Sequence, residues 1–126
     1  LGNKKIFNTK ELRKNNFTII NFWASWCAPC RKEHKYLVKL SKNKNVKILG
    51  INFKDEKSKA NAFLKELGDP FYLKAFDNKG KTSVSFGVYG IPETILVDKD
   101  LVIKKKYIGP INNKDVKEIL KIINQK

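Results

Sequence analysis

Two cysteines lie at the point where an apolar stretch gives way to a helical pattern. Residues 17–23 read FTIINFW and are almost continuously apolar, which is typical of a central strand buried on both faces. Residues 28–42 have a helical pattern, with Pro29 in the first turn, where proline is tolerated. We therefore expect Cys27 to lie at the N-terminus of a helix that follows a buried strand.

The rest of the chain continues to alternate strands and helices. We expect strands over residues 46–53, 71–76, 94–98 and 101–108, and helices over residues 56–67, 82–86 and a last segment capped by Asn112 or Asn113. A tight turn at Lys99 and Asp100 would join the last two strands into a hairpin. This order predicts an α/β fold with a central mixed sheet flanked by helices. No linker is evident, so we expect residues 1–126 to form one domain.

The placement of the two cysteines suits thiol chemistry. Unpaired N–H groups and the helix dipole favour negative charge at a helix N-terminus, which lowers the pKa of a thiol at Cys27. Cys30 lies one turn further on, close enough to resolve a mixed disulfide formed at Cys27. The pattern predicts a reversible redox dithiol.

Three other uses of the pair remain as alternatives. A structural disulfide that closes so short a loop restrains little unfolded-chain entropy. A zinc site requires four ligands, and Cys27, Cys30 and His34 supply three unless two chains meet. Covalent haem attachment requires histidine directly after the second cysteine, where this chain has Arg31. We therefore expect no metal and no dissociable cofactor beyond the Cys27–Cys30 disulfide itself.

Glu33 shares the helical stripe of Cys30 that should pack on the sheet. A carboxylate there is either tucked beside the cysteines or bent out to solvent. If it is partly buried near a thiol, it raises the pKa of that thiol and can shuttle its proton. We expect His34, one residue along, to be a surface residue.

The net charge of +15 raises the question of nucleic acid. By count, 25 of the 27 basic residues are lysine and they are scattered along the chain, whereas arginine is the residue favoured for bidentate phosphate and guanine contacts. We therefore expect a solvated lysine-rich surface and no nucleic-acid binding. The alternative is a positive face that attracts an acidic partner or anionic lipid headgroups.

No apolar run in the chain approaches the roughly 20 residues needed to span a bilayer. The chain has no methionine, even at position 1, so we expect a processed signal or an anchor to have been removed ahead of Leu1.

Two segments of the chain resemble the thioredoxin superfamily. Residues 22–30, FWASWCAPC, resemble its active-site segment, and residues 90–92, GIP, resemble its cis-proline loop. Residues 27–34 (CAPCRKEH), 50–55 (GINFKD) and 87–94 (GVYGIPET) are similar to the CcmG/DsbE family, the membrane-anchored periplasmic thioredoxin-like proteins of cytochrome c maturation. The ResA and TlpA relatives share the Cys-x-x-Cys-x-x-Glu pattern.

The resemblance implies a thioredoxin fold in which residues 56–76 form a helix–strand insertion between the CxxC helix and the cis-proline strand. It implies that Cys27 is the attacking thiolate and Cys30 the resolving thiol. The Ile91–Pro92 bond would be cis and would turn the Ile91 backbone toward the sulfur. A substrate segment could then pair with that backbone as an added strand.

The resemblance also implies roles for residues around the dithiol. Thioredoxin has a buried aspartate where this chain has Asn21, so Glu33 becomes the candidate for proton handling. Tyr89 and Glu93 resemble groove residues, although Tyr89 could be plain packing and Glu93 a solvated strand start. Trp26 would shield the site, or else be a core aromatic.

The implied function is a dithiol reductant of the apocytochrome c CxxCH disulfide, acting directly or through a CcmH-like partner. Electrons would come from a CcdA- or DsbD-like membrane thiol carrier, and haem would belong to the pathway rather than to this chain. The implied protein is a periplasmic monomer that meets the inner membrane only through its missing N-terminal anchor.

The main alternative is a ResA/TlpA-like general extracytoplasmic thiol reductase. An alternative of another class is a basic binding protein with a vestigial thiol pair.

Overall fold

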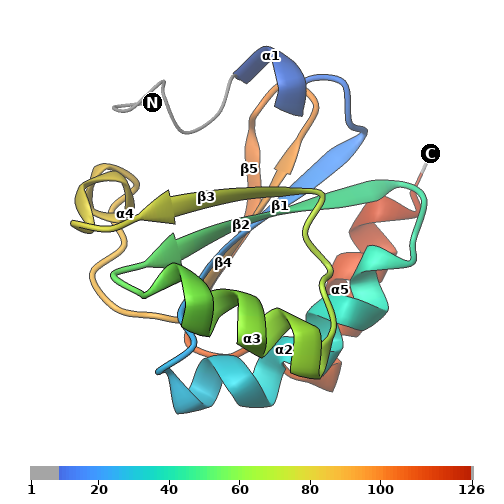
Figure 1. Cartoon of the computed structure of the whole chain (residues 1–126). Helices are drawn as coiled ribbons and strands as arrows, with labels where there is room; N and C mark the ends of the chain where they lie inside the picture. The colour runs from blue at the N-terminus through green and yellow to red at the C-terminus, as the bar shows by residue number, and fades with distance from the viewer. Residues whose placement is uncertain (1–8, 126) are drawn as a thin grey trace.

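Five strands form a mixed sheet in the computed structural model, which describes residues 9–125 (Figure 1). The strands are β1 (Phe17–Trp23), β2 (Val46–Phe53), β3 (Leu73–Asp77), β4 (Glu93–Asp98) and β5 (Ile103–Ile108), in the spatial order β3-β2-β1-β4-β5. β1 pairs with β2 in parallel, as β2 does with β3, whereas β4 is antiparallel to both β1 and β5. The predicted mixed sheet is confirmed.

Helices cover both faces of the sheet. They are α1 (Thr9–Leu12), α2 (Ala28–Ser41), α3 (Lys57–Leu67), α4 (Lys81–Ser85) and α5 (Asn113–Ile123). The buried residues of α2, α3 and α5 share one hydrophobic cluster with Ile19 and Trp23 of β1. Leu12 of α1 joins the cluster on the other face. None of the helices among residues 9–125 is long and apolar enough to cross a membrane.

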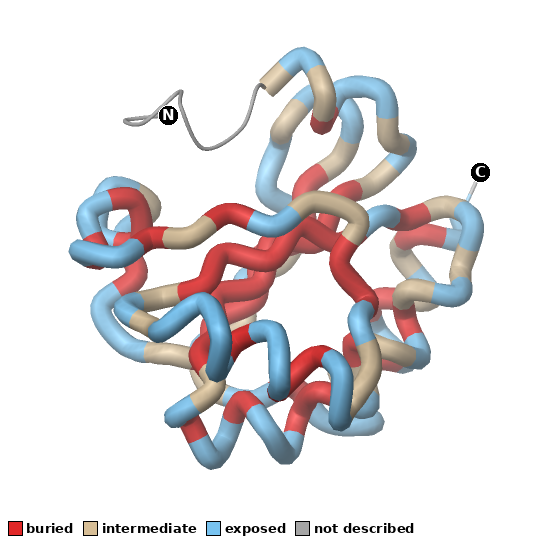
Figure 2. Tube along the Cα trace, viewed as in Figure 1, coloured by how far each residue is buried: buried red, intermediate tan, exposed pale blue. Residues whose placement is uncertain are grey.

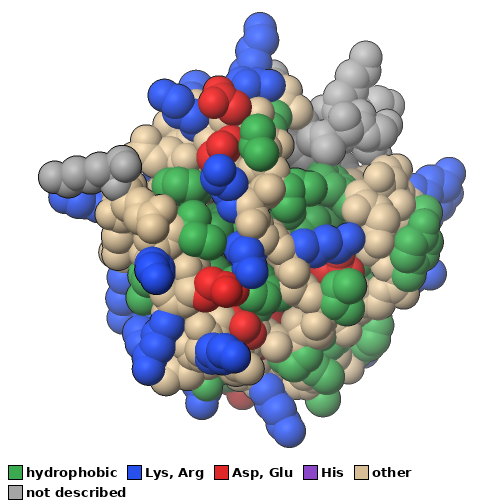
Figure 3. Space-filling model, turned by 180° about the vertical axis from the view of Figure 1, so that it is seen from behind, with side chains coloured by type: hydrophobic (Ala, Val, Ile, Leu, Met, Phe, Trp, Pro, Cys, Tyr) green, Lys and Arg blue, Asp and Glu red, His purple; other side chains and the backbone are tan. Residues whose placement is uncertain are grey.

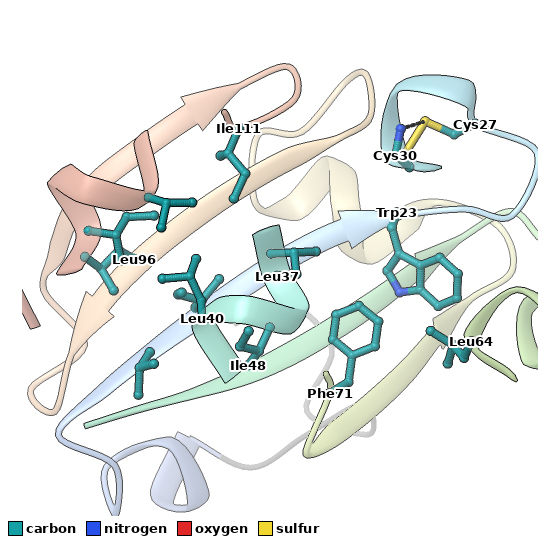
Figure 4. Packing of buried hydrophobic residues seen from close by; sticks show 14 of the residues in the cluster. Trp23, Cys27, Cys30, Leu37, Leu40, Ile48, Leu64, Phe71, Leu96 and Ile111 are labelled. Atoms are coloured by element: carbon teal, nitrogen blue, oxygen red, sulfur yellow. Dashed lines mark hydrogen bonds between the residues drawn. A yellow bond between two sulfur atoms is a disulfide. The ribbon is translucent and has the colours of Figure 1, made fainter. Parts of the chain in front are cut away.

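The strand that precedes the cysteines is buried on both faces, as its apolar run predicts (Figure 2). Ile19 and Trp23 point into the α2 side of the sheet, and Ile20 and Phe22 point into the other. Trp23 stacks on Phe71, with ring centroids 5.5 Å apart (Figure 4). β1 is therefore held from both sides, and it fixes where the loop to Cys27 begins.

Two strands, β3 and β5, begin two residues later than expected, whereas the other predicted boundaries differ by at most one residue. β3 begins at Leu73 rather than at residue 71, because Phe71 turns its ring into the core over Trp23. The β4–β5 connection takes residues 99–102. There the Asp98 carboxylate accepts hydrogen bonds from the backbone N–H groups of Asp100 and Val102 and so organises a wider turn.

Basic side chains are spread over the surface rather than gathered in one patch on the face seen in Figure 3, where a few acidic side chains lie among them. Several lysines form ion pairs with carboxylates, as Lys74 does with Asp69 at 2.7 Å. This distribution agrees with the solvated lysine-rich surface expected from the sequence.

Candidate active site

Cys27 is the N-cap residue of α2, and Cys30 lies in the first turn. The Cys30 backbone N–H donates to Cys27 Sγ at 3.2 Å, and the two sulfurs form a disulfide (Figure 4). Both residues are largely buried, Cys27 with 5% of its surface exposed and Cys30 with 1%. An N-terminal N–H directed at the Cys27 sulfur is the arrangement that stabilises a thiolate when the pair is reduced.

The loop between β1 and Cys27 is clamped to the end of β2. Ser25 donates from its backbone N–H and its hydroxyl to the two oxygens of Asp55, at 2.7 and 2.8 Å. Burial raises the pKa of Asp55, but hydrogen bonds from Ser25 and Asn52 outweigh it and hold the pKa below its ordinary value. The carboxylate is therefore ionised at neutral pH and anchors the loop that positions Cys27.

Glu33 lies on the buried face of α2, with 1% of its surface exposed. Asn21 of β1 donates through Nδ2 to Glu33 Oε2 at 2.9 Å, and the Ile111 backbone N–H donates to Oε1 at 3.0 Å. The same Asn21 Nδ2 donates to the Thr94 hydroxyl of β4 at 3.0 Å. Of the two positions predicted for Glu33, the structure has the buried one.

Burial of Glu33 raises the pKa of its carboxyl from 4.5 to about 7, against the lowering effect of the hydrogen bonds from Ile111 and Asn21. A carboxyl with a pKa near ambient pH is suited to general acid–base transfer, because it both accepts and returns a proton there. Glu33 follows Cys30 by one turn of α2 and is buried on the same side of the helix, so the Cys30 thiol is the candidate partner for this proton transfer.

The predicted cis-proline loop, residues 90–92, lies at the same end of the sheet as the two cysteines. β4 begins at Glu93, which pairs with Phe22 at the end of β1, and the Ile91–Pro92 peptide bond is cis, as predicted. Ile91 packs against the hydrophobic cluster that contains Cys27 and Cys30. The structure therefore brings together the cysteines and the cis-proline loop, which lie far apart in the sequence.

A hollow of about 320 Å³ lies along the cis-proline loop and is lined mainly by residues 89–93 together with Ile108 and Gly109. Tyr89 is 81% exposed and Ile108 is 83% exposed at its rim. Large apolar side chains held open to solvent beside a hollow are typical of a surface that binds another molecule. Plain packing, the alternative for Tyr89, is wrong.

Glu93 is buried, with 3% of its surface exposed, so the alternative of a solvated strand start is wrong. The Lys106 ammonium of β5 lies 3.1 Å from Glu93 Oε1 and supplies the counter-charge that a buried carboxylate requires. The pair lies at the β4–β5 end that borders the hollow.

Trp26 is 59% exposed, which rules out the core alternative for this ring. Its indole N–H donates to the Lys54 carbonyl at 3.0 Å, and its ring lies beside Phe53. The ring is therefore held in one orientation at the surface, next to Cys27 in sequence.

The expectation that His34 is a surface residue is wrong, because only 1% of it is exposed. Its Nε2 lies 2.8 Å from the Gly68 carbonyl oxygen, and its ring packs edge-on against Phe63. Burial lowers its pKa, so the ring is neutral at pH 7. His34 therefore joins α2 to the end of α3.

Besides the contact between Ser25 and Asp55, sequence reasoning missed four contributors to this region: Thr94, Ile108, Lys106 and Ile111. Three of them act through side chains whose types are common on strands and surfaces. Ile111 acts through its backbone N–H, which has no signature in the sequence. The one available signal was the position of Ile108 just ahead of Gly109 and Pro110 at a strand end.

The chain matches the family model described as Redoxin over residues 2–123. It is 41% identical to the thiol:disulfide interchange protein DsbE of Vibrio cholerae over 93% of this chain and 63% of that protein. It is 40% identical to DsbE of Haemophilus influenzae over 100% of this chain and 69% of the relative. The chain thus spans somewhat under two thirds of the Vibrio cholerae protein.

The fold is similar to that of a DsbF homologue from Corynebacterium diphtheriae. The two superpose with a TM-score of 0.73 and 26% sequence identity, over 85% of this chain and 71% of that one. The predicted thioredoxin fold, with α3 and β3 between the cysteine helix and the cis-proline strand, is confirmed by this likeness and by the observed element order.

Proposed function

Because the chain belongs to the Redoxin family and, within it, to the DsbE thiol:disulfide interchange proteins, we propose that it is a thiol-disulfide oxidoreductase that works as a dithiol reductant. The observation that supports this most is the Cys27–Cys30 pair at the N-terminus of α2, one turn from a buried carboxyl. The redox-active disulfide is the only cofactor that this chemistry requires.

The reaction is a thiol–disulfide exchange in two steps. The Cys27 thiolate attacks one sulfur of the substrate disulfide, forming a mixed disulfide and releasing the first substrate thiolate. Cys30 then gives its thiol proton to the Glu33 carboxylate and attacks the Cys27 sulfur, which releases the second substrate thiolate. The substrate gains two electrons, and the Cys27–Cys30 disulfide forms.

The substrate segment lies along the cis-proline loop in this proposal. The hollow lined by Tyr89, Ile91, Pro92 and Glu93 provides an apolar surface, and the Ile91 backbone offers an edge with which an extended segment can pair. Trp26, which directly precedes Cys27, also offers an exposed ring to a substrate. A peptide that carries a disulfide between closely spaced cysteines fits such a shallow, open surface.

The substrate is the disulfide of the CxxCH motif of apocytochrome c, reached directly or through a CcmH-like partner. A CcdA- or DsbD-like membrane thiol carrier returns two electrons to the Cys27–Cys30 disulfide. The domain works in the periplasm, tethered to the inner membrane. These assignments follow from the resemblance at residues 87–94, and the alternative is a general ResA/TlpA-like reductase.

Trapping of the mixed disulfide tests the cysteine roles. The Cys30→Ser variant should accumulate a mixed disulfide with an oxidised CxxCH peptide, because Cys27 attacks and nothing resolves it. The Cys27→Ser variant is the matched control and should trap none. Mass spectrometry reads both; trapping through Cys30 alone would overturn the assignment.

Substrate preference tests the finer proposal. The reduced protein should reduce an oxidised CxxCH peptide faster than the same peptide with its cysteines moved apart, and faster than insulin. Equal rates on all three would favour the general reductase. A midpoint potential of the Cys27–Cys30 pair far above that of thioredoxin would contradict a reductant of either kind.

A further inference from the structure

The side-chain amide of Asn21 makes an incomplete set of hydrogen bonds. Its Nδ2 uses both hydrogens, one on Glu33 Oε2 at 2.9 Å and one on Thr94 Oγ1 at 3.0 Å. Its Oδ1 is buried and has no partner among residues 9–125. A buried amide oxygen without a donor is costly, so the orientation is dictated by what the nitrogen contacts.

The contacts of Glu33 fit one protonation state of its carboxyl. Oε2 accepts from Asn21 and Oε1 accepts from the Ile111 backbone N–H. An ionised carboxylate accepts at both oxygens, but a protonated carboxyl must also donate one O–H. The two groups that the structure places on these oxygens are both donors, so neither of them can accept the O–H of a protonated Glu33.

We propose that the Asn21 amide turns over by half a rotation when Glu33 takes up a proton, so that both forms of the carboxyl are hydrogen-bonded. The turn puts Oδ1 where Nδ2 lies now, at hydrogen-bonding distance from Glu33 Oε2 and Thr94 Oγ1. Oδ1 then accepts from the Glu33 O–H.

Thr94 makes the reversal possible because a hydroxyl both accepts and donates. In the present orientation it accepts from Asn21 Nδ2; after the turn it donates to Oδ1. One amide atom lacks a partner in either orientation, so the two forms have equal numbers of hydrogen bonds. Asn21 is thus a positioning residue that acts through Glu33.

Few of the groups around Glu33 are charged or can titrate when its charge changes. β1 and β4 face it with Asn21 and Thr94, and the segment before α5 faces it with the Ile111 backbone; none of these titrates. α2 contributes the Cys27–Cys30 pair, His34, whose Nε2 is engaged by Gly68, and the Arg31, Lys32, Lys35 and Tyr36 side chains, which line a groove that Glu33 itself borders.

This inference rests on the proposed function, in which Glu33 receives the Cys30 proton and later returns it. An Asn21 amide that reverses when Glu33 is protonated keeps the carboxyl hydrogen-bonded in both its ionised and its protonated state. An aspartate at position 21 could not do this, because an ionised carboxylate has no hydrogen to donate to Glu33.

The test follows the Asn21 side-chain NH₂ group by NMR in the oxidised protein, where the cysteines do not titrate. Nuclear Overhauser contacts from these protons to Thr94 should be present at pH 9 and lost at pH 5. The midpoint should coincide with the titration of the Glu33 carboxyl carbon. Asn52 is the matched control, since its buried Nδ2 donates to Asp55 and its Oδ1 also lacks a partner. Its contacts should not change.

The Glu33→Gln variant provides a second measurement. When the oxygen of the introduced amide accepts from the Ile111 N–H, the NH₂ group of that amide faces Asn21 and requires an acceptor. The Asn21 amide should therefore adopt the reversed orientation at every pH. Contacts that stay unchanged from pH 9 to pH 5 while Glu33 titrates, or an unreversed Asn21 amide in the variant, would overturn the inference. Neither result depends on disulfide exchange, so failure here and failure of the trapping experiment are distinguishable.

Discussion

At the scale of single residues, Glu33 combines deep burial with a pair of hydrogen bonds from Asn21 and Ile111. The two effects oppose each other, and burial prevails, because the pKa rises to about 7. Sequence spacing predicts that Glu33 faces the sheet. It does not predict which donors lie there, since Ile111 is 78 positions away along the chain.

The raised pKa makes the stability of the oxidised protein depend on pH. Native Glu33 holds its proton up to about pH 7, whereas the unfolded chain releases it near 4.5, so stability should fall as pH rises between these values and level off above. The full loss is about 3 kcal/mol, at about 1.4 kcal/mol per pKa unit. Urea unfolding across this range measures it.

The Glu33→Gln variant is the control for this prediction, because it cannot lose a proton and should show no such fall. Burial lowers the pKa of His34, so His34 reduces the stability as the pH falls below 6.5. This contribution is equal in both proteins. The difference between the two curves therefore isolates Glu33. Parallel curves would contradict the pKa of about 7.

At the scale of elements, the α3–β3 insertion is joined to the sheet by a close contact between Phe71 and Gly50 of β2. A Cβ atom on Gly50 would lie 2.8 Å from the ring carbons of Phe71, and that ring also stacks on Trp23. Gly50 therefore sets how closely the insertion approaches the strand that leads to Cys27.

Replacing Gly50 with alanine should destabilise the protein by about 1–3 kcal/mol, because the overpacked ring must move away from Trp23. Gly90→Ala is the matched control, since no atom of residues 9–125 lies within 4 Å of an added Cβ and the φ of Gly90 is not positive. Chemical unfolding followed by tryptophan fluorescence compares them. Equal stability of the two variants would show that Phe71 adjusts freely.

At the scale of the whole molecule, a net charge of +15 is carried by a surface on which basic side chains far outnumber acidic ones. Like charges at such density repel one another in the compact state. Raising NaCl from 10 mM to 300 mM at pH 7 should therefore raise the melting temperature, because salt shortens the screening length from about 30 Å to below 10 Å. Scanning calorimetry measures it.

A melting temperature that falls with salt would contradict this prediction. It would mean that favourable ion pairs, such as the one between buried Glu93 and exposed Lys106, outweigh the general repulsion. Potassium chloride at matched ionic strength is the control for effects specific to sodium.

The sequence by itself determined the order of elements and the chemistry of Cys27 and Cys30. Those features depend on local periodicity and on a strand-to-helix junction, and neighbouring residues specify both. It also predicted the cis bond before Pro92, through the resemblance of residues 90–92 to the cis-proline loop of thioredoxins.

Only the tertiary structure decided which groups surround Glu33 and that His34 is buried. Asn21, Thr94 and Ile111 come from three separate segments, and the register of β1 against β4 is what aligns the first two. His34 lies inside because α3 covers its side of α2. Burial is a property of what packs on a residue, and one helix's own sequence cannot specify its neighbours.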